Sequence, residues 1–346
     1  MTERPLDVAV VGAGQAALAL SHALVGGPLR HACFAADARV GDAWRRRWDS
    51  LRLFTPAQYD GLPGLPFPAP VDHYPTKDEV ADYLEIYADR FALPIALDVR
   101  VTRLHRDGDV FVLTTTRGPV RARQVVLATG SYGEPRTPEF AAQLGDTVTQ
   151  LHAAHYRRPD TLPPGPVVVV GGGASGVQIA ADLAATRSVT LCRGRREVVL
   201  PQRIFGRDIW YWLERTPDVS ARSPLGRLLA RSDPLVGEGP RGLERRLGVP
   251  SRARAIAAEP GALRLADGSR LPVTSVVWAT GHAHALGWID LPVQDAGGTP
   301  LHRDGASPVP GLYFLGLRWM RSRGSSLLGW VGRDAEHIAR LLLARA

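Results

Sequence analysis

Residues 7–17 read DVAVVGAGQAA, in which a short β-branched run enters a glycine turn and continues as an apolar segment to Leu24. This order predicts a strand, a tight turn and a helix. The GxGxxA spacing lets the backbone approach a pyrophosphate at a helix N-terminus, which favours negative charge. A glycine-rich turn alone can be purely structural, so the flanking strand and helix carry the prediction. The predicted dinucleotide contacts in this turn are Gly12, Ala13, Gly14, Gln15 and Ala16.

The same order of elements recurs in the middle of the chain. Residues 167–176 read VVVVGGGASG, a β-branched strand followed by a complete GxGxxG turn, and residues 177–185 continue as a predicted helix. A second strand is expected at 188–192. Two such units predict an α/β protein with two doubly wound, Rossmann-like dinucleotide-binding domains. The predicted nucleotide contacts in the second turn are Gly171, Gly173, Ala174, Ser175 and Gly176.

Proline and glycine mark the limits of the second unit. Residues 163–166 read PPGP, and residues 281–288 lead back toward the first unit. An ATG triplet follows a β-branched strand in each unit, at residues 128–130 and 279–281. We therefore expect the second unit to be inserted into the first. The expected first domain comprises residues 1–162 and 285–346, and the expected second domain comprises residues 163–284.

A dinucleotide fingerprint expects an acidic residue near the end of the second strand, where it holds the ribose hydroxyls. In the first unit the strand expected at 31–35 is followed by Ala36 and then by Asp37. Asp37 either binds the ribose from a shifted position or is a solvated loop aspartate, in which case the nucleotide is held less tightly.

The corresponding strand of the second unit ends in Cys192 and is followed by Arg193, Gly194, Arg195 and Arg196, without an acid. A guanidinium group pairs well with a 2′-phosphate because of its fork geometry. The sequence therefore favours NADPH over NADH, with Arg193 and Arg195 as the candidate contacts. A charge cluster after a strand is also typical of a solvated turn.

The chain has 346 residues, of which 45% are hydrophobic and 22% charged, and this is ordinary for a globular protein with buried cores. We find neither a signal peptide nor an apolar stretch long enough to span a bilayer, so we expect a cytoplasmic protein without a membrane partner. Cys33 and Cys192 are the only cysteines. They cannot form a disulfide framework, a CxxC redox centre or a zinc site, and no metal is expected.

Arginine supplies nearly all of the positive charge behind the formal net charge of +8, because Lys77 is the only lysine. An arginine-rich surface can indicate nucleic-acid binding. Here the arginines are spread along the chain, and no basic run with interleaved aromatic residues, zinc finger or helix-turn-helix pattern accompanies them. We therefore do not expect a nucleic-acid partner.

A series of motifs resembles those of the class B flavoprotein monooxygenases, which include flavin-containing monooxygenases, Baeyer–Villiger enzymes and plant indole-pyruvate monooxygenases. Each motif alone is loose, whereas their order and spacing together are specific, and the resemblance covers nearly the whole chain. The motifs are GAGQAA at Gly12, GDAWRRRWDSLRLFTP at Gly41, YPTKDEVADYL at Tyr74, ATG at Ala128, QLHAAHY at Gln150, GGGASG at Gly171, ATG at Ala279 and GLYFLG at Gly311.

The resemblance implies that the first domain binds FAD and that the second binds NADPH. Leu53, Thr55 and Pro56 would approach the isoalloxazine, and residues 326–328 would present backbone N–H groups to the pyrimidine edge of the flavin. Beyond the first glycine turn, the implied FAD contacts are Trp44, Leu53, Thr55, Val101, Ala128, Thr129, Gly130, Ser326 and Leu327. The second ATG triplet, Ala279, Thr280 and Gly281, completes the expected NADPH site.

Three residues are candidates for a catalytic role. His152 and Tyr156 match the second half of the family fingerprint, whose first half is replaced by Asp146 and Val148. Tyr156 stands where Baeyer–Villiger enzymes tend to carry Trp, which favours the other subgroups. The alternative for His152 is a structural histidine between the domains. Thr55 is the nearest candidate for the polar residue that the family carries near the flavin.

In the scheme that the resemblance implies, NADPH reduces FAD, oxygen adds at flavin carbon 4a, and retained NADP⁺ shields the resulting (hydro)peroxide from water. The expected partners are O2 and a small to medium apolar organic substrate, which would be oxygenated at N or S, hydroxylated or oxidised at a carbonyl. Formation of a homodimer is left open. Aromatic residues that would either wall the substrate cavity or belong to the core are Trp210, Tyr211, Trp212, Trp319 and Trp330.

Two other functions remain open at this point. The first is an NADPH-dependent flavin reductase or oxidase that passes electrons to a quinone or a protein partner, since two distant cysteines exclude a thiol substrate handled through a redox pair. The second is a nucleotide-binding regulator with degenerate chemistry, which the displaced acid at Asp37 would permit. Flavin that stays bound during purification would count against the regulator.

Overall fold

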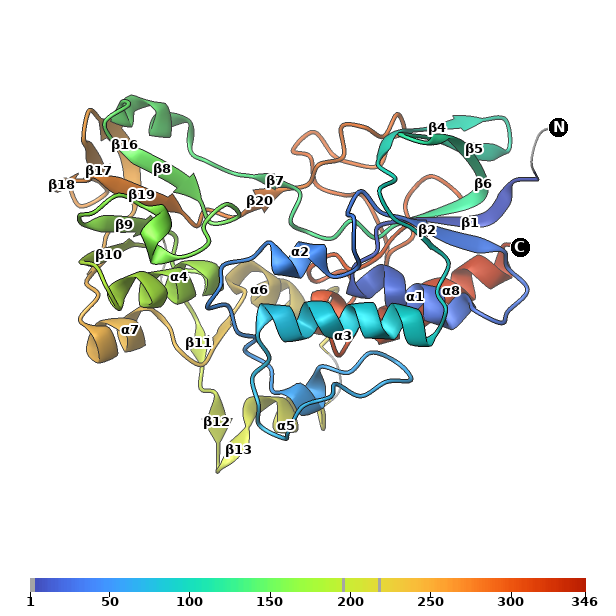
Figure 1. Ribbon diagram of the computed structural model, residues 1–346, viewed down its shortest axis with the longest axis horizontal. Coiled ribbons are helices and arrows are strands. Elements are labelled where there is room, and N and C mark those ends of the chain that lie inside the picture. The colour runs from blue at the N-terminus through green and yellow to red at the C-terminus, as the bar shows by residue number, and fades with distance from the viewer. Residues whose placement is uncertain (1–3, 195–196, 217–218) are drawn as a thin grey trace.

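The computed structural model describes residues 4–194, 197–216 and 219–346, which form two lobes joined by a pair of connecting strands (Figure 1). The predicted fold class is confirmed, because each lobe contains a parallel sheet in which a glycine turn leads from a central strand into a helix.

The first sheet has the strand order β3-β2-β1-β6-β5-β4, and β21 pairs with β6. The pairs that link β3, β2, β1, β6 and β21 are parallel, whereas β5 pairs antiparallel with both β6 and β4. Pairing of β21 with β6 returns the C-terminal part of the chain to the first lobe. The strands are β1 (Leu6–Val11), β2 (His31–Phe34), β3 (Ile95–Ala96), β4 (Val101–Asp107), β5 (Val110–Thr115), β6 (Gly118–Leu127) and β21 (Leu312–Phe314).

Two helices from opposite ends of the chain lie side by side against the first sheet (Figure 1). α1 (Gln15–Leu24) packs on α8 (Val331–Ala344), and most side chains of α1 are buried because both the sheet and α8 cover it. A short helix, α2 (Asp42–Arg45), packs on α3 (Lys77–Arg90), which lies beside α1. The C-terminal helix therefore completes the core of the first lobe.

α3 holds the Pro-rich loop 55–75 against the first lobe. The helix begins at a capping box, because the Thr76 hydroxyl accepts a bond from Glu79 N and the Glu79 carboxylate accepts one from Thr76 N. Farther along the helix, the hydroxyls of Tyr83 and Tyr87 donate to carbonyl groups of the loop. A loop without long regular structure is thereby held in one position next to α3.

The second sheet has the order β15-β10-β9-β19-β8, and its strand pairs are all parallel. The VVVV run of β9 is buried on both faces: Val167 and Val169 pack toward α4 (Ala174–Ala184), and Val168 and Val170 pack toward an antiparallel three-stranded sheet. The remaining strands are β8 (Thr149–His152), β9 (Val167–Val170), β10 (Val189–Cys192), β15 (Ser251–Arg252) and β19 (Ser275–Trp278), with β16 (Ala255–Glu259), β17 (Ala262–Leu265) and β18 (Arg270–Pro272) in the antiparallel sheet.

The connection between the lobes consists of β7 (Glu134–Pro135) and β20 (His282–Ala283), which pair antiparallel. β8 precedes the expected domain limit at residue 163, yet it pairs with β19 in the second sheet. The second unit, as its sheet defines it, therefore starts before residue 163. The strand at 149–152 was not expected from the sequence, and the domain limits themselves stay a prediction.

A third part of the structure, the cap segment (residues 197–216 and 219–237), leaves the second lobe after β10 and lies beneath the junction of the lobes (Figure 1). Its hairpin of β12 and β13 points away from both lobes (Figure 1). Ile209 and Trp210 of the cap segment form a small core with Trp330 at the start of α8. The elements are β11 (Val199–Leu200), β12 (Arg203–Ile204), β13 (Arg207–Asp208), α5 (Ile209–Leu213), α6 (Pro224–Ser232) and β14 (Leu235–Val236), followed by α7 (Pro240–Leu247) of the second lobe.

The elements around both glycine turns lie where the sequence predicts them. The helix expected at 177–185 begins already at Ala174, because the last three residues of the GxGxxG motif form its first turn. Short 3-10 turns are η1 (Ala57–Tyr59), η2 (Glu139–Leu144), η3 (Pro159–Thr161) and η4 (Arg323–Ser326). Of the helices that the structure describes, none combines the length and the apolar character that a bilayer crossing requires.

Candidate functional site

The first glycine turn has the shape that a pyrophosphate needs. Gly12 adopts φ +123°, and a Cβ at this position would lie 2.5 Å from the carbonyl oxygen of Ala128, so the turn requires glycine. Gly14 is the N-cap of α1, lacks a side-chain cap and faces open space on the side where a Cβ would lie. The first N–H groups of α1 can therefore bind an anion.

The second glycine turn repeats this geometry. Gly171 adopts φ +130°, and a Cβ there would overlap the carbonyl oxygen of Ala279. Gly176 packs so closely on the Gly171 carbonyl that it also admits no side chain. Gly173 is the N-cap of α4 and, like Gly14, borders open space. The described residues therefore fit two dinucleotides, one at the start of each helix.

Like the two glycine turns, a further set of predicted site residues follows the carboxyl ends of parallel strands, which is where doubly wound sheets bind their ligands. The set comprises Asp37 after β2, Ala128, Thr129 and Gly130 after β6, His152 at the end of β8, Arg193 after β10, and Ala279, Thr280 and Gly281 after β19. Trp44 belongs to α2, and Val101 is the first residue of β4.

A cleft of about 1310 Å³ lies between the two lobes and the cap segment. It brings the second glycine turn together with the loop that follows α2 and with the end of η4, although these segments are far apart in the sequence. The predicted site residues that line the cleft are Leu53, His152, Gly173, Ala174, Ser175, Gly176, Ala279, Gly281, Ser326 and Leu327. The cleft therefore joins the expected NADPH and flavin contacts.

Gln15 links three of the expected FAD contacts. Its amide nitrogen donates to the carbonyl oxygen of Ser326 over 3.1 Å, and its amide oxygen accepts a bond from the Trp44 indole over 3.1 Å. The first glycine turn, α2 and the C-terminal segment are thereby held together at one point. Nothing in the sequence of the glycine motif indicated that Gln15 would bridge these segments.

Asp37 is held by an arginine in this structure. Its carboxylate pairs with Arg46 at 2.7 Å, and its backbone oxygen accepts a bond from Asp98 N. Because Asp98 shortly precedes Val101, this bond brings the segments of two expected FAD contacts, Asp37 and Val101, together. A ribose contact by Asp37 stays a prediction.

Thr55 contacts an acid that the sequence analysis did not single out. The Thr55 hydroxyl donates to Asp60 Oδ1 over 2.5 Å, and both side chains are buried. Burial raises the pKa of Asp60 to about 7, against the smaller opposing effect of the Thr55 bond. Asp60 is one of two acids in this mostly apolar, Pro-rich loop, the other being the exposed Asp72, and this composition is the signal that could have identified it.

His152 lines the cleft and also holds the connection between the lobes. Its Nε2 lies 3.0 Å from the carbonyl oxygen of Gly281, and its Nδ1 accepts a bond from Ala154 N, which assigns the ring hydrogen to Nε2. Burial lowers the pKa of His152. Burial and, to a smaller extent, the neighbouring His152 lower the pKa of His282 to about 4. The rings of His152 and His282 meet edge to face at 5.0 Å. His152 therefore has the contacts of a structural, neutral histidine at the edge of the cleft.

Tyr156 does not reach the cleft. It is fully buried among the core residues of the second lobe, and its hydroxyl donates to Asp182 of α4 over 2.6 Å. A direct catalytic role, as expected from the fingerprint, does not fit this position, because the only polar atom of the side chain is already bonded inside the fold. The contact instead attaches the segment after β8 to the helix of the second glycine turn.

The arginine that follows β10 has a partner that the sequence analysis overlooked. Arg193 Nη1 lies 3.1 Å from the carboxylate of Glu197, whose other oxygen occupies the space next to Gly172. An acid is therefore present beside the expected 2′-phosphate position after all. Arg195, the second candidate contact, lies outside the described residues.

The aromatic residues divide between cleft and core. Trp319 lines the cleft and adopts φ +55°, a strained conformation for a bulky side chain. Trp210 and Trp330 are buried against each other, with ring centres 5.0 Å apart, and join the cap segment to α8. Tyr211 and Trp212 lie on the outer side of the cap, where Trp212 is partly exposed. Only one of the five thus lines the expected substrate cavity.

Two arginines in the stretch RWMRSRGSS at 318–326 also line the cleft. Arg318 pairs with Asp233 of the cap segment. Arg323 donates to the Pro234 carbonyl oxygen over 3.0 Å and lies over the ring of Trp210, and burial lowers its pKa. The density of arginines next to the expected flavin segment was the signal that could have identified them.

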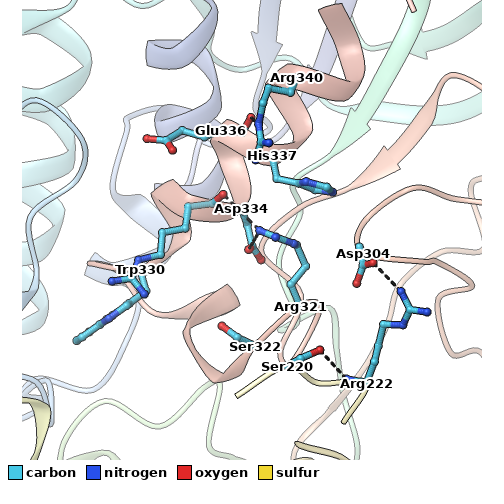
Figure 2. A pocket seen from close by; sticks show the side chains of 11 residues that line it. Ser220, Arg222, Asp304, Arg321, Ser322, Trp330, Asp334, Glu336, His337 and Arg340 are labelled. Atoms are coloured by element: carbon cyan, nitrogen blue, oxygen red, sulfur yellow. Dashed lines mark hydrogen bonds and ion pairs between the residues drawn. The ribbon is translucent and has the colours of Figure 1, made fainter. Parts of the chain in front are cut away.

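A second cavity, of about 710 Å³, lies where the cap segment meets the start of α8 (Figure 2). Its charged residues are largely paired with one another: Arg222 reaches Asp304 over 2.9 Å, and Arg321 reaches Asp334 over 3.0 Å. The backbone of Ala221 also donates to the Arg321 carbonyl oxygen. The cavity therefore marks the seam that attaches the cap segment to the first lobe.

Two glycine turns at helix N-termini, together with a cleft that the second turn lines alongside the expected flavin contacts, define an α/β oxidoreductase that binds two dinucleotides. Residues 9–213 match the model of the family described as pyridine nucleotide-disulphide oxidoreductase. The chain belongs to this family and, within it, to the class B flavoprotein monooxygenases that depend on FAD and NADPH.

Relatives cover nearly the full length of the chain. An uncharacterized CzcO-like oxidoreductase of Geobacillus kaustophilus (strain HTA426) is 41% identical over 98% of both chains, and the CzcO oxidoreductase of Bacillus subtilis (strain 168) is 35% identical over 96% of this chain and 98% of that one. The solved structure of a flavin-containing monooxygenase from Stenotrophomonas maltophilia is 30% identical, with a TM-score of 0.85 and 99% of each chain covered.

Proposed function

We propose that this monooxygenase inserts one oxygen atom of O2 into a small to medium apolar organic molecule that enters the cleft between the lobes and the cap segment. The observation that carries the proposal is the cleft itself, because Gly173 and Ala174 of the second turn and Leu53, Ser326 and Leu327 of the expected flavin site line one continuous space. A nicotinamide bound at α4 could then reach the flavin face in the same space.

When bound, the flavin supplies the redox and oxygen chemistry. The protein binds and orients the two dinucleotides and shields the reacting atoms from water. The N-termini of α1 and α4 would bind the two pyrophosphates, Gln15 would hold Trp44 and the Ser326 carbonyl around the flavin, and Trp319 with the cap segment would exclude water from the reacting atoms. His152 would position the Gly281 turn beside the nicotinamide.

The cysteines argue against a disulfide-reducing activity. Cys33 and Cys192 are buried in different sheets, and burial raises the pKa of each thiol to about 12. Neither is close enough to the other to form a redox pair, and neither thiol ionises readily at neutral pH. This leaves a reductase or oxidase with a quinone or protein acceptor as the alternative to oxygenation.

The decisive experiment reduces the FAD-loaded protein with NADPH and mixes it with oxygenated buffer in a stopped-flow spectrometer. We expect a near-ultraviolet transient that decays before the oxidised flavin spectrum returns, and faster decay with a sulfide, amine or ketone that is recovered oxygenated. Immediate reoxidation with one hydrogen peroxide per NADPH, unaffected by these substrates, would instead identify an oxidase. Protein that binds no FAD would support the regulator.

A further inference from the structure

Asp60 is a fully buried carboxyl group in the Pro-rich loop, directly after η1. One of its oxygens accepts the short bond from Thr55, and the other, Oδ2, has no hydrogen-bond partner among the described residues. A buried carboxylate with an unbonded oxygen is costly, whereas a protonated carboxyl group needs only one acceptor for its proton. The surroundings therefore raise the pKa of Asp60 to about 7, so that the carboxyl group can change its protonation state near neutral pH.

The position of Asp60 places it behind the expected flavin site. Gly329 packs so closely on the backbone of Tyr59 and Asp60 that a side chain there would overlap the Tyr59 carbonyl. Gly329 shortly follows Ser326 and Leu327, which line the cleft, and Leu53 lines it from the other side. Thr55 and Asp60 thus lie between two segments that the proposed function assigns to the flavin.

Few other groups act on the charge of Asp60. Tyr83 of α3 is the titratable side chain that faces it, and burial raises the pKa of Tyr83 to about 12, so this residue stays neutral. The pKa of Tyr59, in the same loop, is also raised, and burial is the largest cause. The segment after η4 contributes Gly329, which carries no charge. Asp60 can therefore respond mainly to charge that appears in the flavin site.

We infer that Asp60 is a buried proton-accepting residue that acts through Thr55 and takes up one proton when the bound flavin is reduced. The inference rests on the proposed function, because it needs the flavin beside Thr55. Asp60 does not itself touch the expected flavin position and is therefore a positioning residue.

Charge balance gives the physical reason. Hydride transfer from NADPH adds two electrons and one proton to the flavin and so adds one negative charge to a site with few mobile charges. Uptake of a solvent proton by the Asp60 carboxyl group, at Oδ1, offsets that charge and reverses the direction of the Thr55 bond without losing it. Protonated Asp60 can donate to Thr55, and the hydroxyl hydrogen of Thr55 then becomes free to turn toward the flavin.

The test is the pH dependence of the flavin midpoint potential, measured by reductive titration of the FAD-loaded protein against a reference dye from about pH 7 to about pH 9. If Asp60 takes up a proton, the midpoint potential of the wild type falls by about 60 mV per pH unit over part of this range. This corresponds to about a hundredfold fall in the reduction equilibrium constant. In Asp60→Asn we expect about a tenfold change, or about 30 mV per unit, because one proton then accompanies two electrons.

A matched control is Asp72→Asn, in the same loop, where the side chain is exposed and φ is +64°, a conformation that Asn tolerates. The midpoint potential of this variant should show the same pH dependence as that of the wild type. Thr55→Val removes the bond that lowers the pKa of Asp60, so the steep part of its curve should move to higher pH. If Asp60→Asn fails to fold, the wild-type slope and the Thr55→Val shift still decide the question.

Equal slopes of about 30 mV per pH unit in the wild type and in both variants would overturn the inference while leaving the proposed function intact. A purified wild type that binds no FAD would overturn both. A steep wild-type curve that persists unchanged in Asp60→Asn would assign the extra proton to another group and would equally reject the role of Asp60.

Discussion

At the scale of single residues, the carboxylate of Glu197 lies over the second glycine turn and holds the guanidinium group expected to bind a 2′-phosphate. The two side chains are largely buried, at 24% and 11% exposure, so their attraction is only partly screened by water. NADPH would have to replace Glu197 as the partner of Arg193, whereas NADH could offer its ribose hydroxyls to the acid. We therefore expect the pair to influence how strongly the site prefers a phosphorylated cofactor.

Removing the competing acid should sharpen the preference for NADPH. In Glu197→Gln we expect the ratio of kcat/KM for flavin reduction, NADPH over NADH, to rise about tenfold, because Arg193 loses its partner and a like charge leaves the phosphate position. In Arg193→Ala the same ratio should fall by at least about tenfold. Arg264→Ala, an exposed arginine of β17, serves as the control. Unchanged ratios in both variants would assign phosphate recognition elsewhere.

At the scale of elements, each nucleotide-binding turn contains glycines that serve different purposes. Gly171 is required by the backbone, since its φ of +130° and its contact with Ala279 exclude a Cβ. Gly173 has ordinary backbone angles and open space beside it, so its lack of a side chain matters only to a ligand. Substitution by alanine should separate these two effects.

We expect Gly173→Ala to fold with a thermal stability close to the wild type but to bind NADPH at least about tenfold more weakly, because its methyl group enters the pyrophosphate space. Gly171→Ala should lose both binding and roughly 2 kcal/mol or more of unfolding free energy. Calorimetry and fluorescence titration with NADPH distinguish the cases. Full NADPH affinity in Gly173→Ala would place the pyrophosphate away from the N-terminus of α4.

At the scale of the whole molecule, the cleft exists only while the cap segment is attached to the first lobe. The attachment consists of the small aromatic core around Trp210 and Trp330 and of ion pairs along the seam shown in Figure 2. Partly exposed ion pairs contribute about 0.2–1 kcal/mol each. We therefore expect the aromatic core to provide most of the attachment and the ion pairs to contribute less.

Breaking one seam ion pair should loosen the cap without unfolding the lobes. In Asp304→Asn, which removes the partner of Arg222, we expect hydrogen exchange in α6 to become up to about fivefold faster and more hydrogen peroxide to form per NADPH. Glu259→Gln, which breaks exposed pairs in the antiparallel sheet of the second lobe, should leave both quantities unchanged. If α6 exchanges hydrogen at the same rate in the wild type, in Asp304→Asn and in Glu259→Gln, the pair of Arg222 and Asp304 does not hold the cap.

The sequence alone determined the two nucleotide-binding units and their order, because glycine turns between a β-branched strand and a helix depend on local backbone geometry. The same locality explains why the positions of β1, α1, β9 and β19 were predictable. β8 was missed because its four residues, 149–152, include one β-branched residue and become a strand only by pairing with β19. The burial of Tyr156 was not predictable, because a fingerprint records which residue is present and not where its hydroxyl points.

Tertiary structure alone decided which distant groups meet. Asp60 acquires its unusual environment from α3 and from the close approach of Gly329, which are remote from it in sequence, and Glu197 acquires its importance from the position of Gly172. Burial depends on contacts between separate elements, and no spacing rule within one segment records it. The two glycine turns were therefore readable from the chain, whereas the burial of Asp60 and the position of Glu197 beside the second glycine turn arise only when separate segments pack together.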